Sequence, residues 1–301
     1  MKHLLTLEQL SAATITGIFD LAKELKAKRG KSQESPLKGQ TWALIFNKAS
    51  TRTRVSFEVG IRELGGTSLY LSSADIQMGR GETVADTARV LSRYVHGVVI
   101  RTFAQRDVEE FASAGTIPVI NGLTDDEHPC QVLADLFTIS EKFGSLKGRK
   151  VVFAGDGACN VCNSWLFGAA KTGVELWIAA PKQFQPGKDW LSRAAGKIHV
   201  TEDFAAAVRD ADVVYTDVWV SMGKETESAA RLKALAPYQI NDRILKAAKP
   251  GALVMHCLPA YRGKEITGEV FEAHQQTIFD QAENRLHIQK AILIQLARLR
   301  A

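Results

Sequence analysis

The sequence predicts an α/β protein with two doubly wound parallel-sheet domains, and three observations support this fold class. Short apolar runs alternate with longer segments of helical period along the chain, as they do in βαβ units. The 301 residues are enough for two domains of about 150 residues each. Polar residues able to do chemistry follow several apolar runs, at the strand ends where open α/β sheets bind ligands.

Each apolar run predicts a strand. In the first half the expected strands are 41–46, 68–71, 97–101 and 117–120. In the second half they are 150–154, 175–179, 213–216 and 252–256, with a further candidate at 277–279. The helical patterns between them cover 7–28, 53–64, 83–94, 129–142 and 161–171.

The segment "KFGSLKGRK" (142–150) interrupts the apolar pattern before a fresh strand. It therefore predicts a first domain over 1–142 and a second over 148–282. The remaining segment, 283–301, is amphipathic, and we expect it to form a helix that crosses back to complete the first domain.

Composition excludes several function classes. The chain is 46% hydrophobic with a net charge of +5 and an isoelectric point near 9.0, as expected for a soluble protein of small anionic substrates. The basic run 23–31 ends in a glycine and lacks interleaved aromatic residues, which favours a solvated helix end over a nucleic-acid site. No apolar run approaches the roughly 20 residues that a membrane helix needs.

Four cysteines, Cys130, Cys159, Cys162 and Cys257, occur in a chain without a signal-peptide pattern. So few cysteines in a chain of this length favour a reducing compartment over a disulfide framework. We therefore expect a cytoplasmic protein.

The segment "STRTR" (50–54) follows the first expected strand and begins the next helix. Free backbone N–H groups at a helix N-terminus favour phosphate, and guanidinium groups can add bidentate hydrogen bonds. A plain helix start is the alternative, with Ser50 or Thr51 as N-cap and Arg54–Glu58 as an i,i+4 pair. Two arginines and three hydroxyls exceed what a cap needs, so we expect a phosphate site. The glycine-rich loop of nucleoside-triphosphate sites is absent.

Five polar groups stand just past expected strands, and two facing sheets would bring them to one cleft. They are Ser50 to Arg54, Arg101, Asp156, Asp217 and the pair His256-Cys257. Such convergence predicts an enzyme.

The segment "GDGACNVC" (155–162) invites two other interpretations, and both are weak. As a dinucleotide fingerprint it lacks the third glycine. As a metal or redox motif, Cys159-x-x-Cys162 has no second pair at matching spacing.

Four segments, in the same order, resemble the aspartate and ornithine carbamoyltransferase family. They are "STRTR" (50–54), "HPCQ" (128–131), "DVWVSMG" (217–223) and "HCLPA" (256–260). The last two are similar to the ornithine branch, whereas the aspartate branch is expected to have "HPLPR" in place of "HCLPA". Cys257 is therefore the discriminating residue, and the resemblance extends over essentially the whole chain.

The resemblance implies that the carbamoyl group of carbamoyl phosphate passes to the side-chain amine of ornithine, giving citrulline and phosphate in arginine metabolism. It implies a site in the cleft between the domains and requires neither a metal nor a cofactor. It also implies that the segment 221–239 closes over the amine.

The resemblance assigns site residues as well. For carbamoyl phosphate it implies Ser50, Thr51, Arg52, Thr53, Gln77, Arg101, His128, Gln131, Cys257, Leu258 and Arg285. For ornithine it implies Asn160, Asp217, Ser221 and Met222. The expected catalytic residues are Arg101, His128, Asp217 and Cys257. Gln77 matches a position lent across a subunit interface, which implies a homo-oligomer, a trimer or a multiple of trimers.

Two details of the site stay open. Asp125-Asp126-Glu127 would favour a protonated His128. Cys159 stands where the family usually has an asparagine, which puts substrate affinity and reactivity toward thiol reagents in question.

Three alternatives remain. The first is a sister transferase acting on N-acetylornithine, putrescine or aspartate. The second is a nucleophilic Cys257 with a histidine base, although adjacent strand residues point to opposite faces, which makes His256 a poor partner. The third is a non-catalytic protein that binds anions or nucleic acid.

Overall fold

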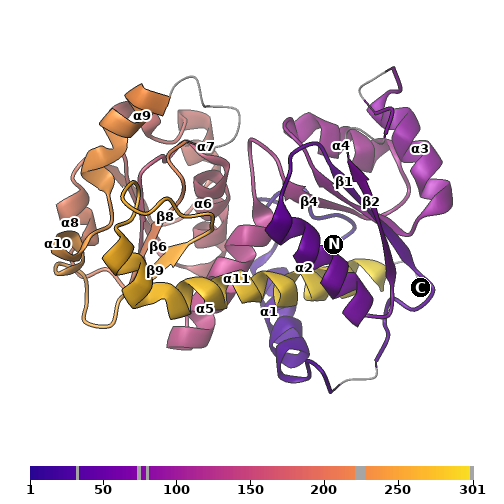
Figure 1. The fold of residues 1–301 in the computed structure, drawn as a ribbon, viewed down its shortest axis with the longest axis horizontal. Coiled ribbons are helices and arrows are strands. Elements are labelled where there is room, and N and C mark those ends of the chain that lie inside the picture. The colour runs from indigo at the N-terminus through magenta and orange to yellow at the C-terminus, as the bar shows by residue number, and fades with distance from the viewer. Residues whose placement is uncertain (32–33, 73–75, 79–80, 221–227, 299–301) are drawn as a thin grey trace. The chain divides into compact units, whose positions relative to one another are not determined.

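The computed structural model describes residues 1–298 except 32–33, 73–75, 79–80 and 221–227. The chain forms two compact units, Met1–Leu133 with Arg285–Ala301 and Ala134–Asn284 (Figure 1). Each is a parallel sheet with helices around it, so the predicted α/β class with two parallel-sheet domains is confirmed.

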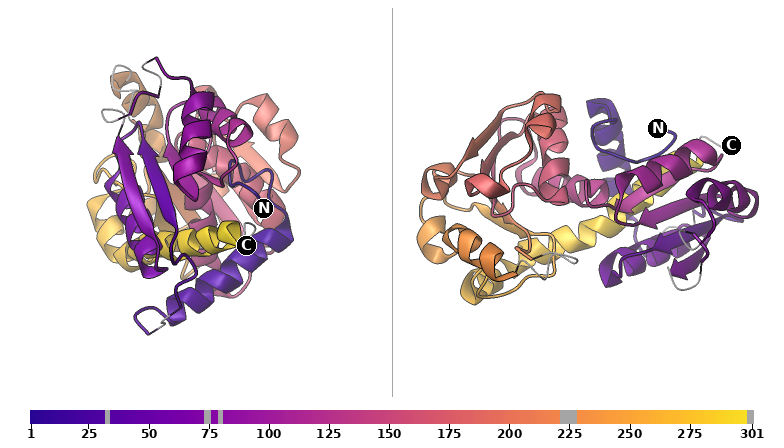
Figure 2. Two further views of the ribbon diagram at one scale, coloured as in Figure 1. Left: turned by 90° about the vertical axis from the view of Figure 1, so that its right-hand side faces the viewer. Right: turned by 90° about the horizontal axis from the view of Figure 1, so that it is seen from above.

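The first unit holds a four-stranded parallel sheet of order β2-β1-β3-β4. Its strands are β1 (Thr41–Phe46), β2 (Thr67–Ser72), β3 (Gly97–Arg101) and β4 (Val119–Leu123). Its helices are α1 (Ala12–Ala27), α2 (Thr51–Glu63), α3 (Val84–Tyr94) and α4 (Gln105–Ala114). Figure 2 (left) shows the parallel purple arrows of β1 and β2 side by side.

Register in this sheet positions the site. Phe46, the last residue of β1, pairs with Arg101, the last residue of β3. The loop after β1 and the Arg101 side chain therefore leave the sheet at the same edge. Gly97 permits the close packing beneath them, because a Cβ there would lie 2.4 Å from the ring of Trp42.

The second unit holds a five-stranded parallel sheet of order β7-β6-β5-β8-β9. Its strands are β5 (Lys150–Ala154), β6 (Glu175–Ala179), β7 (Ile198–Thr201), β8 (Val213–Thr216) and β9 (Leu253–His256). Its helices are α6 (Asn160–Thr172), α7 (Lys188–Arg193), α8 (Phe204–Val208), α9 (Ser228–Leu235) and α10 (Asp242–Leu245), with short 3₁₀ turns at Lys182–Phe184 and Ala236–Tyr238.

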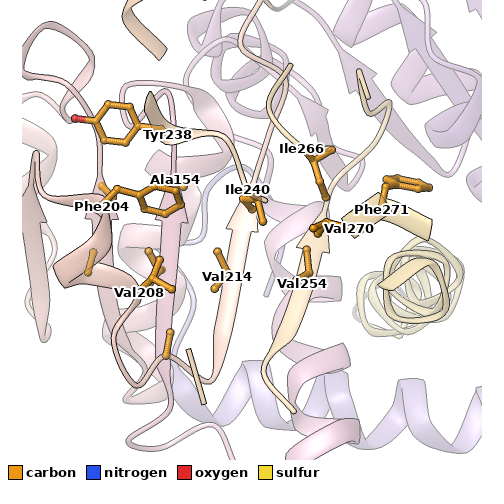
Figure 3. Packing of buried hydrophobic residues seen from close by; sticks show 14 of the residues in the cluster. Ala154, Phe204, Val208, Val214, Tyr238, Ile240, Val254, Ile266, Val270 and Phe271 are labelled. Atoms are coloured by element: carbon orange, nitrogen blue, oxygen red, sulfur yellow. The ribbon is translucent and has the colours of Figure 1, made fainter. Parts of the chain in front are cut away.

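The apolar core on one face of this sheet is drawn in Figure 3. Val214 and Val254 project from neighbouring strands toward side chains of surrounding helices, Val208 from α8 and Phe271 from the last helix. Burying this apolar face against helices is what fixes the sheet.

Two helices contribute residues to both units, α5 (Pro129–Phe143) and α11 (Gly268–Ala297). From Arg285 onward α11 belongs to the first unit, where Ile288, Ile292, Leu293 and Leu296 are buried. The expected return of the C-terminal helix to the first domain is therefore confirmed.

The expected strands match the structure within three residues at either end, apart from one error and one omission. The candidate at 277–279 is wrong, because these residues lie inside α11. Ile278 is buried seven and eight residues after Phe271 and Val270, which is a helical spacing. The omitted strand is β7, a four-residue strand at the sheet edge. None of the described helices is long and apolar enough to cross a membrane.

Candidate active site

The segment 50–54 forms the start of α2. Ser50 is the N-cap, with an extended backbone, and its hydroxyl accepts a hydrogen bond from the backbone N–H of Thr53 at 3.3 Å. The backbone N–H groups of Thr51 and Arg52 therefore lie in the first turn of the helix, at the positive end of its dipole. Both side chains are exposed. The segment is therefore a capped helix start whose geometry is compatible with an anion site.

The two arginines of the segment have different surroundings. Arg54 donates to Glu58 at 2.9 Å and lies over the ring of Tyr70 at 3.6 Å. Arg52 has no ion pair of this kind among the described residues. Arg54 is therefore engaged within the fold, while the Arg52 guanidinium stays available to a ligand.

Three arginines and one histidine lie close together at the carboxyl ends of the strands of the first sheet. They are Arg52, Arg101, Arg285 and His128. Burial beside Arg285 and Arg52 lowers the pKa of Arg101 to about 10. Burial beside Arg285 and Arg101 holds the pKa of His128 well below its usual value. Arg101 is 7% exposed and Arg285 is 4% exposed, so these are buried cations. Burial of a cation is costly, and a bound anion would offset part of that cost.

Arg285 reaches this cluster from α11. Its guanidinium donates to the hydroxyl of the buried Thr53 at 2.7 Å. Gln131 is buried in the first turn of α5, directly after His128. Six of the expected carbamoyl-phosphate residues come from α2, β3, α5 with the residue just before it, and α11. They are Arg52, Thr53, Arg101, His128, Gln131 and Arg285.

The acidic run before His128 does not set the pKa of its imidazole, which burial, Arg285 and Arg101 lower. Asp125 forms an ion pair with Lys48, and the Glu127 carboxylate accepts the backbone N–H of Leu7 at 3.0 Å. The expectation that this run favours a protonated His128 is wrong, because burial and two arginines dominate.

In the second unit, Asp217 and Cys257 form the polar pair. The Cys257 thiol donates to Asp217 Oδ1 at 2.7 Å, and the N–H of Val218 donates to the same oxygen at 2.7 Å. Burial and the neighbouring Asp217 carboxylate raise the pKa of Cys257 well above its usual value. Burial also raises the pKa of Asp217, although the thiol hydrogen bond opposes the shift. The thiol is therefore a protonated hydrogen-bond donor near neutral pH.

His256 is directed away from this pair. Its Nδ1 accepts the N–H of Leu258 at 2.9 Å, so Nε2 carries the proton toward Glu265 Oε1 at 3.1 Å. Leu258 has a φ of 60°, a conformation that bulky residues rarely adopt and that often marks a functional segment. Both ring nitrogens of His256 are occupied, so it cannot serve as the base of Cys257.

Helix α6 begins beside the carboxylate of Asp217. Cys159 is its N-cap, and the sulfur accepts the N–H of Cys162 at 3.4 Å. Burial, and then the negative charges of Asp217 and Asp156, raise the pKa of Cys159, which places this thiol near both carboxylates. Asn160, the expected ornithine residue, is the first residue of the helix and is half-buried.

Asp156 serves a structural purpose. It forms a buried ion pair with Arg231 of α9, and Arg231 also donates to the backbone oxygen of Trp219 at 2.9 Å. Both carboxylate oxygens of Asp156 have partners within the fold, because the N–H of Ala158 donates to the second oxygen at 3.0 Å.

Gln77 is exposed, and no described contact joins its side chain to the cluster of the first unit. Ser221 and Met222 lie outside the described residues, as does the first part of the segment 221–239. Among the residues that the structure describes, no group of three His, Cys, Asp or Glu side chains could hold a metal ion.

The motifs also left out four buried polar residues that support the clusters. They are Lys48, Arg231, Glu265 and Gln281. Lys48 stands two residues before Ser50, which was a usable signal. Glu265 pairs with His256 only nine residues away, but the partners of Arg231 and Gln281 come from distant parts of the chain.

Two parallel α/β units with polar clusters after their strands define a two-domain protein for small ligands. Residues 2–141 match the family model of the carbamoyl-P binding domain of aspartate/ornithine carbamoyltransferase. Residues 147–296 match the model of its Asp/Orn binding domain. The chain belongs to the aspartate/ornithine carbamoyltransferase family.

Individual relatives agree with this placement. The ornithine carbamoyltransferase of Akkermansia muciniphila is 52% identical over 303 residues, covering 100% of this chain and 99% of that protein. The structure resembles that of ornithine carbamoyltransferase from Pyrococcus furiosus, with 47% identity, a TM-score of 0.91 and coverage of 97% and 96% of the two chains. It also resembles the anabolic ornithine carbamoyltransferase of Campylobacter jejuni, with 42% identity, a TM-score of 0.93 and coverage of 99% and 100%.

Proposed function

We propose that this protein transfers the carbamoyl group of carbamoyl phosphate to the side-chain amine of L-ornithine, giving citrulline and phosphate. The observation that carries the proposal is the buried cluster of Arg101, Arg285 and His128 beside the start of α2. Its chemistry suits a small phosphate ester, and family membership and relatives named ornithine carbamoyltransferase support the acceptor.

The first unit would hold carbamoyl phosphate. Backbone N–H groups of Thr51 and Arg52 meet the phosphate at the helix start, with the hydroxyls of Ser50 and Thr53 beside them. The Arg52 guanidinium adds charge-assisted hydrogen bonds, which strengthen as the leaving phosphate gains charge.

The carbamoyl end would lie against Arg101, His128 and Gln131. A lowered pKa keeps the His128 imidazole neutral, so the ring donates an N–H to the carbonyl oxygen without bringing a further positive charge. Arg285 holds Thr53 in place and adds positive charge to the same site.

The second unit would hold ornithine. An ammonium group cannot attack a carbonyl carbon, so the amine must lose a proton before transfer. Asp217 accepts a hydrogen bond from the amine and orients it, and the Cys257 thiol fixes that carboxylate. We assign the amino-acid end to Asn160, Ser221 and Met222, and we place Leu258 beside the carbamoyl group.

The rival mechanisms fit the geometry less well. A raised thiol pKa and a His256 ring engaged elsewhere disfavour covalent catalysis by Cys257. Burial of Arg101 and Arg285 disfavours a nucleic-acid binding protein, because a polymer backbone needs an accessible basic surface.

The same proposal includes organisation and context. We assign carbamoyl phosphate to the domain 1–142 and ornithine to the domain 148–282, with arginine metabolism in the cytoplasm as the setting. We further propose a trimer in which Gln77 completes the site of a neighbouring subunit. The exposed apolar side chains Val55 and Leu69, the latter on the edge strand β2, fit a subunit contact.

A panel of acceptors tests the function directly. Carbamoyl phosphate is supplied with ornithine, N-acetylornithine, putrescine and aspartate in turn, and ureido product is measured. We expect ornithine to exceed each other amine in kcat/KM by about 100-fold or more, because a site built for specific polar groups rejects analogues without them. Equal turnover with any other acceptor would remove the specific assignment.

A matched pair of variants tests the phosphate site. Arg52→Ala should lower kcat/KM for carbamoyl phosphate by about 100-fold or more, because a donor to the leaving group is lost. Arg54 lies four residues before Glu58, pairs with it and stacks on Tyr70, so Arg54→Ala should change kcat/KM only a few-fold. Steady-state kinetics and thermal melting of both variants provide the comparison, and a larger effect at Arg54 would reverse the assignment.

A further inference from the structure

Gln281 is a fully buried amide in α11 that meets three other elements of its unit. Its Nε2 donates to Asp135 Oδ1 of α5 at 2.7 Å and lies 3.5 Å from the hydroxyl of Tyr215 on β8. Its Oε1 accepts the backbone N–H of His256 on β9 at 3.0 Å. A buried amide satisfied at both ends is a rigid connection.

The contact of Gln281 with β9 supplies a hydrogen-bond partner on the side of β9 that faces away from β8. In the described part of the sheet, β9 is at the edge and pairs with β8 alone. The other side of its backbone needs a partner, and Gln281 supplies one at the last residue of the strand. The carboxylate of Asp135 fixes which end of the amide donates, so the oxygen faces β9.

The residue after this contact is Cys257. Its thiol donates to Asp217 Oδ1 at 2.7 Å, and the next residue, Leu258, has the left-handed backbone described above. A shift of the end of β9 would therefore move the Cys257 thiol relative to Asp217. No other described contact holds the N–H of His256.

We propose that Gln281 is a positioning residue for the amine-acceptor half of the reaction, holding the end of β9 so that Cys257 fixes Asp217 in its working orientation. This inference rests on the proposed function. It adds a residue of α11, twenty-four positions beyond Cys257, to those that set turnover of ornithine.

A neighbouring residue on the same helix provides the matched control. Asn284 is also fully buried, and its amide donates to Thr138 at 2.9 Å and Glu141 at 2.7 Å, both in α5. It therefore joins α11 to α5. Loss of an α11–α5 hydrogen bond is common to both variants, whereas the acceptor of the His256 N–H on β9 is the amide of Gln281.

The experiment compares Gln281→Met with Asn284→Leu in the full-length protein. Gln281→Met should lower kcat/KM for ornithine by about 10- to 100-fold, because misplacement of a polar group at the reacting centre is costly. KM for carbamoyl phosphate should stay within about twofold, since the residues that would bind its phosphate, at the start of α2, lie in the other unit. Asn284→Leu should melt earlier, by an amount similar to that of Gln281→Met, while keeping kcat/KM for ornithine within about threefold.

A second variant separates positioning from folding. In Gln281→Glu the new carboxylate can still accept the N–H of His256, but it meets Asp135 and the two must share a proton. Three titratable residues contact this position: Asp135 from α5, Tyr215 from β8 and His256 from β9, the last through its backbone N–H. Cys257 is the residue after His256. The activity of Gln281→Glu relative to wild type should be highest at acidic pH and should fall as pH rises and the shared proton is lost.

Access to Cys257 gives a readout that does not depend on turnover. Iodoacetamide labelling without substrates, followed by peptide mass analysis, should modify Cys257 several-fold faster in Gln281→Met than in wild type or Asn284→Leu. Equal labelling together with ornithine kinetics within threefold of wild type would overturn the proposal. So would a loss in Asn284→Leu equal to that in Gln281→Met. If wild type itself fails to carbamoylate ornithine, the proposed function fails, and the labelling comparison still decides whether Gln281 holds β9.

Discussion

At the scale of single residues, burial sets the chemistry of the ionisable groups. His128 lies beside Arg285 and Arg101, and both the loss of water and the two positive charges lower its pKa. Cys257 lies beside Asp217, and burial together with that negative charge raises the pKa of the thiol. The two shifts act in opposite directions on the numerical scale, yet each favours the neutral form of its group.

The first residue-scale prediction concerns His128. Because its folded pKa is below the unfolded value of about 6.5, the unfolded chain binds the proton first on acidification. This histidine should therefore lower the free energy of unfolding as pH falls below about 6.5. Nitrogen-15 NMR should show a neutral imidazole at pH 7 in the free protein, with His128→Gln identifying the signal.

A bound anion should change that result. Saturating inorganic phosphate places negative charge near the imidazole and should raise the pKa of His128. A pKa at or above 6.5 without ligand, or no response to phosphate, would contradict the arrangement of the cationic cluster.

At the scale of elements, the starts of helices hold the candidate ligand sites. Helix α2 begins at a serine hydroxyl and α6 at a cysteine sulfur, each just after a strand of its sheet. Sulfur is a weak acceptor, and the Cys159 cap is long at 3.4 Å. The same helix start carries Asn160, so the quality of the cap bears on substrate placement.

A better cap should therefore stabilise α6. Cys159→Asn supplies an amide oxygen in place of the sulfur and should raise the free energy of unfolding by about 0.5–1 kcal/mol. Urea denaturation followed by circular dichroism measures the change, and Cys159→Ala, which has no acceptor, serves as the control. A destabilised asparagine variant would mean that the sulfur is held by packing and not by its hydrogen bond.

The part of α11 that belongs to the first unit is fixed by apolar packing. Ile292 is fully buried there, and Ile292→Ala should cost about 2–5 kcal/mol of unfolding free energy. Gln275→Ala, at an exposed position of the same helix, should change it by less than about 0.5 kcal/mol. Equal effects of the two variants in urea denaturation would show that this packing does not hold the helix.

At the scale of the whole molecule, the proposed trimer predicts complementation between inactive subunits. Arg52→Ala and Gln77→Ala should each be nearly inactive alone. Unfolding and refolding them together at equal amounts should restore activity to about a quarter of wild type, because that fraction of shared sites receives both native halves. Recovery is measured in the mixed sample and in each variant refolded alone, and its absence would mean that each subunit builds its own site.

The sequence alone determined the fold class, most strands and the positions of the four motifs. These follow from local rules: apolar runs form buried parallel strands, hydroxyl residues cap helices, and functional side chains follow strand ends. Even the separate roles of Arg52 and Arg54 could be anticipated, since Glu58 stands one helical turn beyond Arg54.

Only the tertiary structure decided the charge of His128, the occupation of Asp156 by Arg231 and the hold of Gln281 on β9. In each case the deciding partner is distant along the chain, so no local pattern could name it. Asp125, close to His128 in sequence, pairs with Lys48, whereas Arg285, far away in sequence, lies beside His128 and lowers its pKa. Ionisation and hydrogen bonding depend on distance and burial in space, and packing sets both of these.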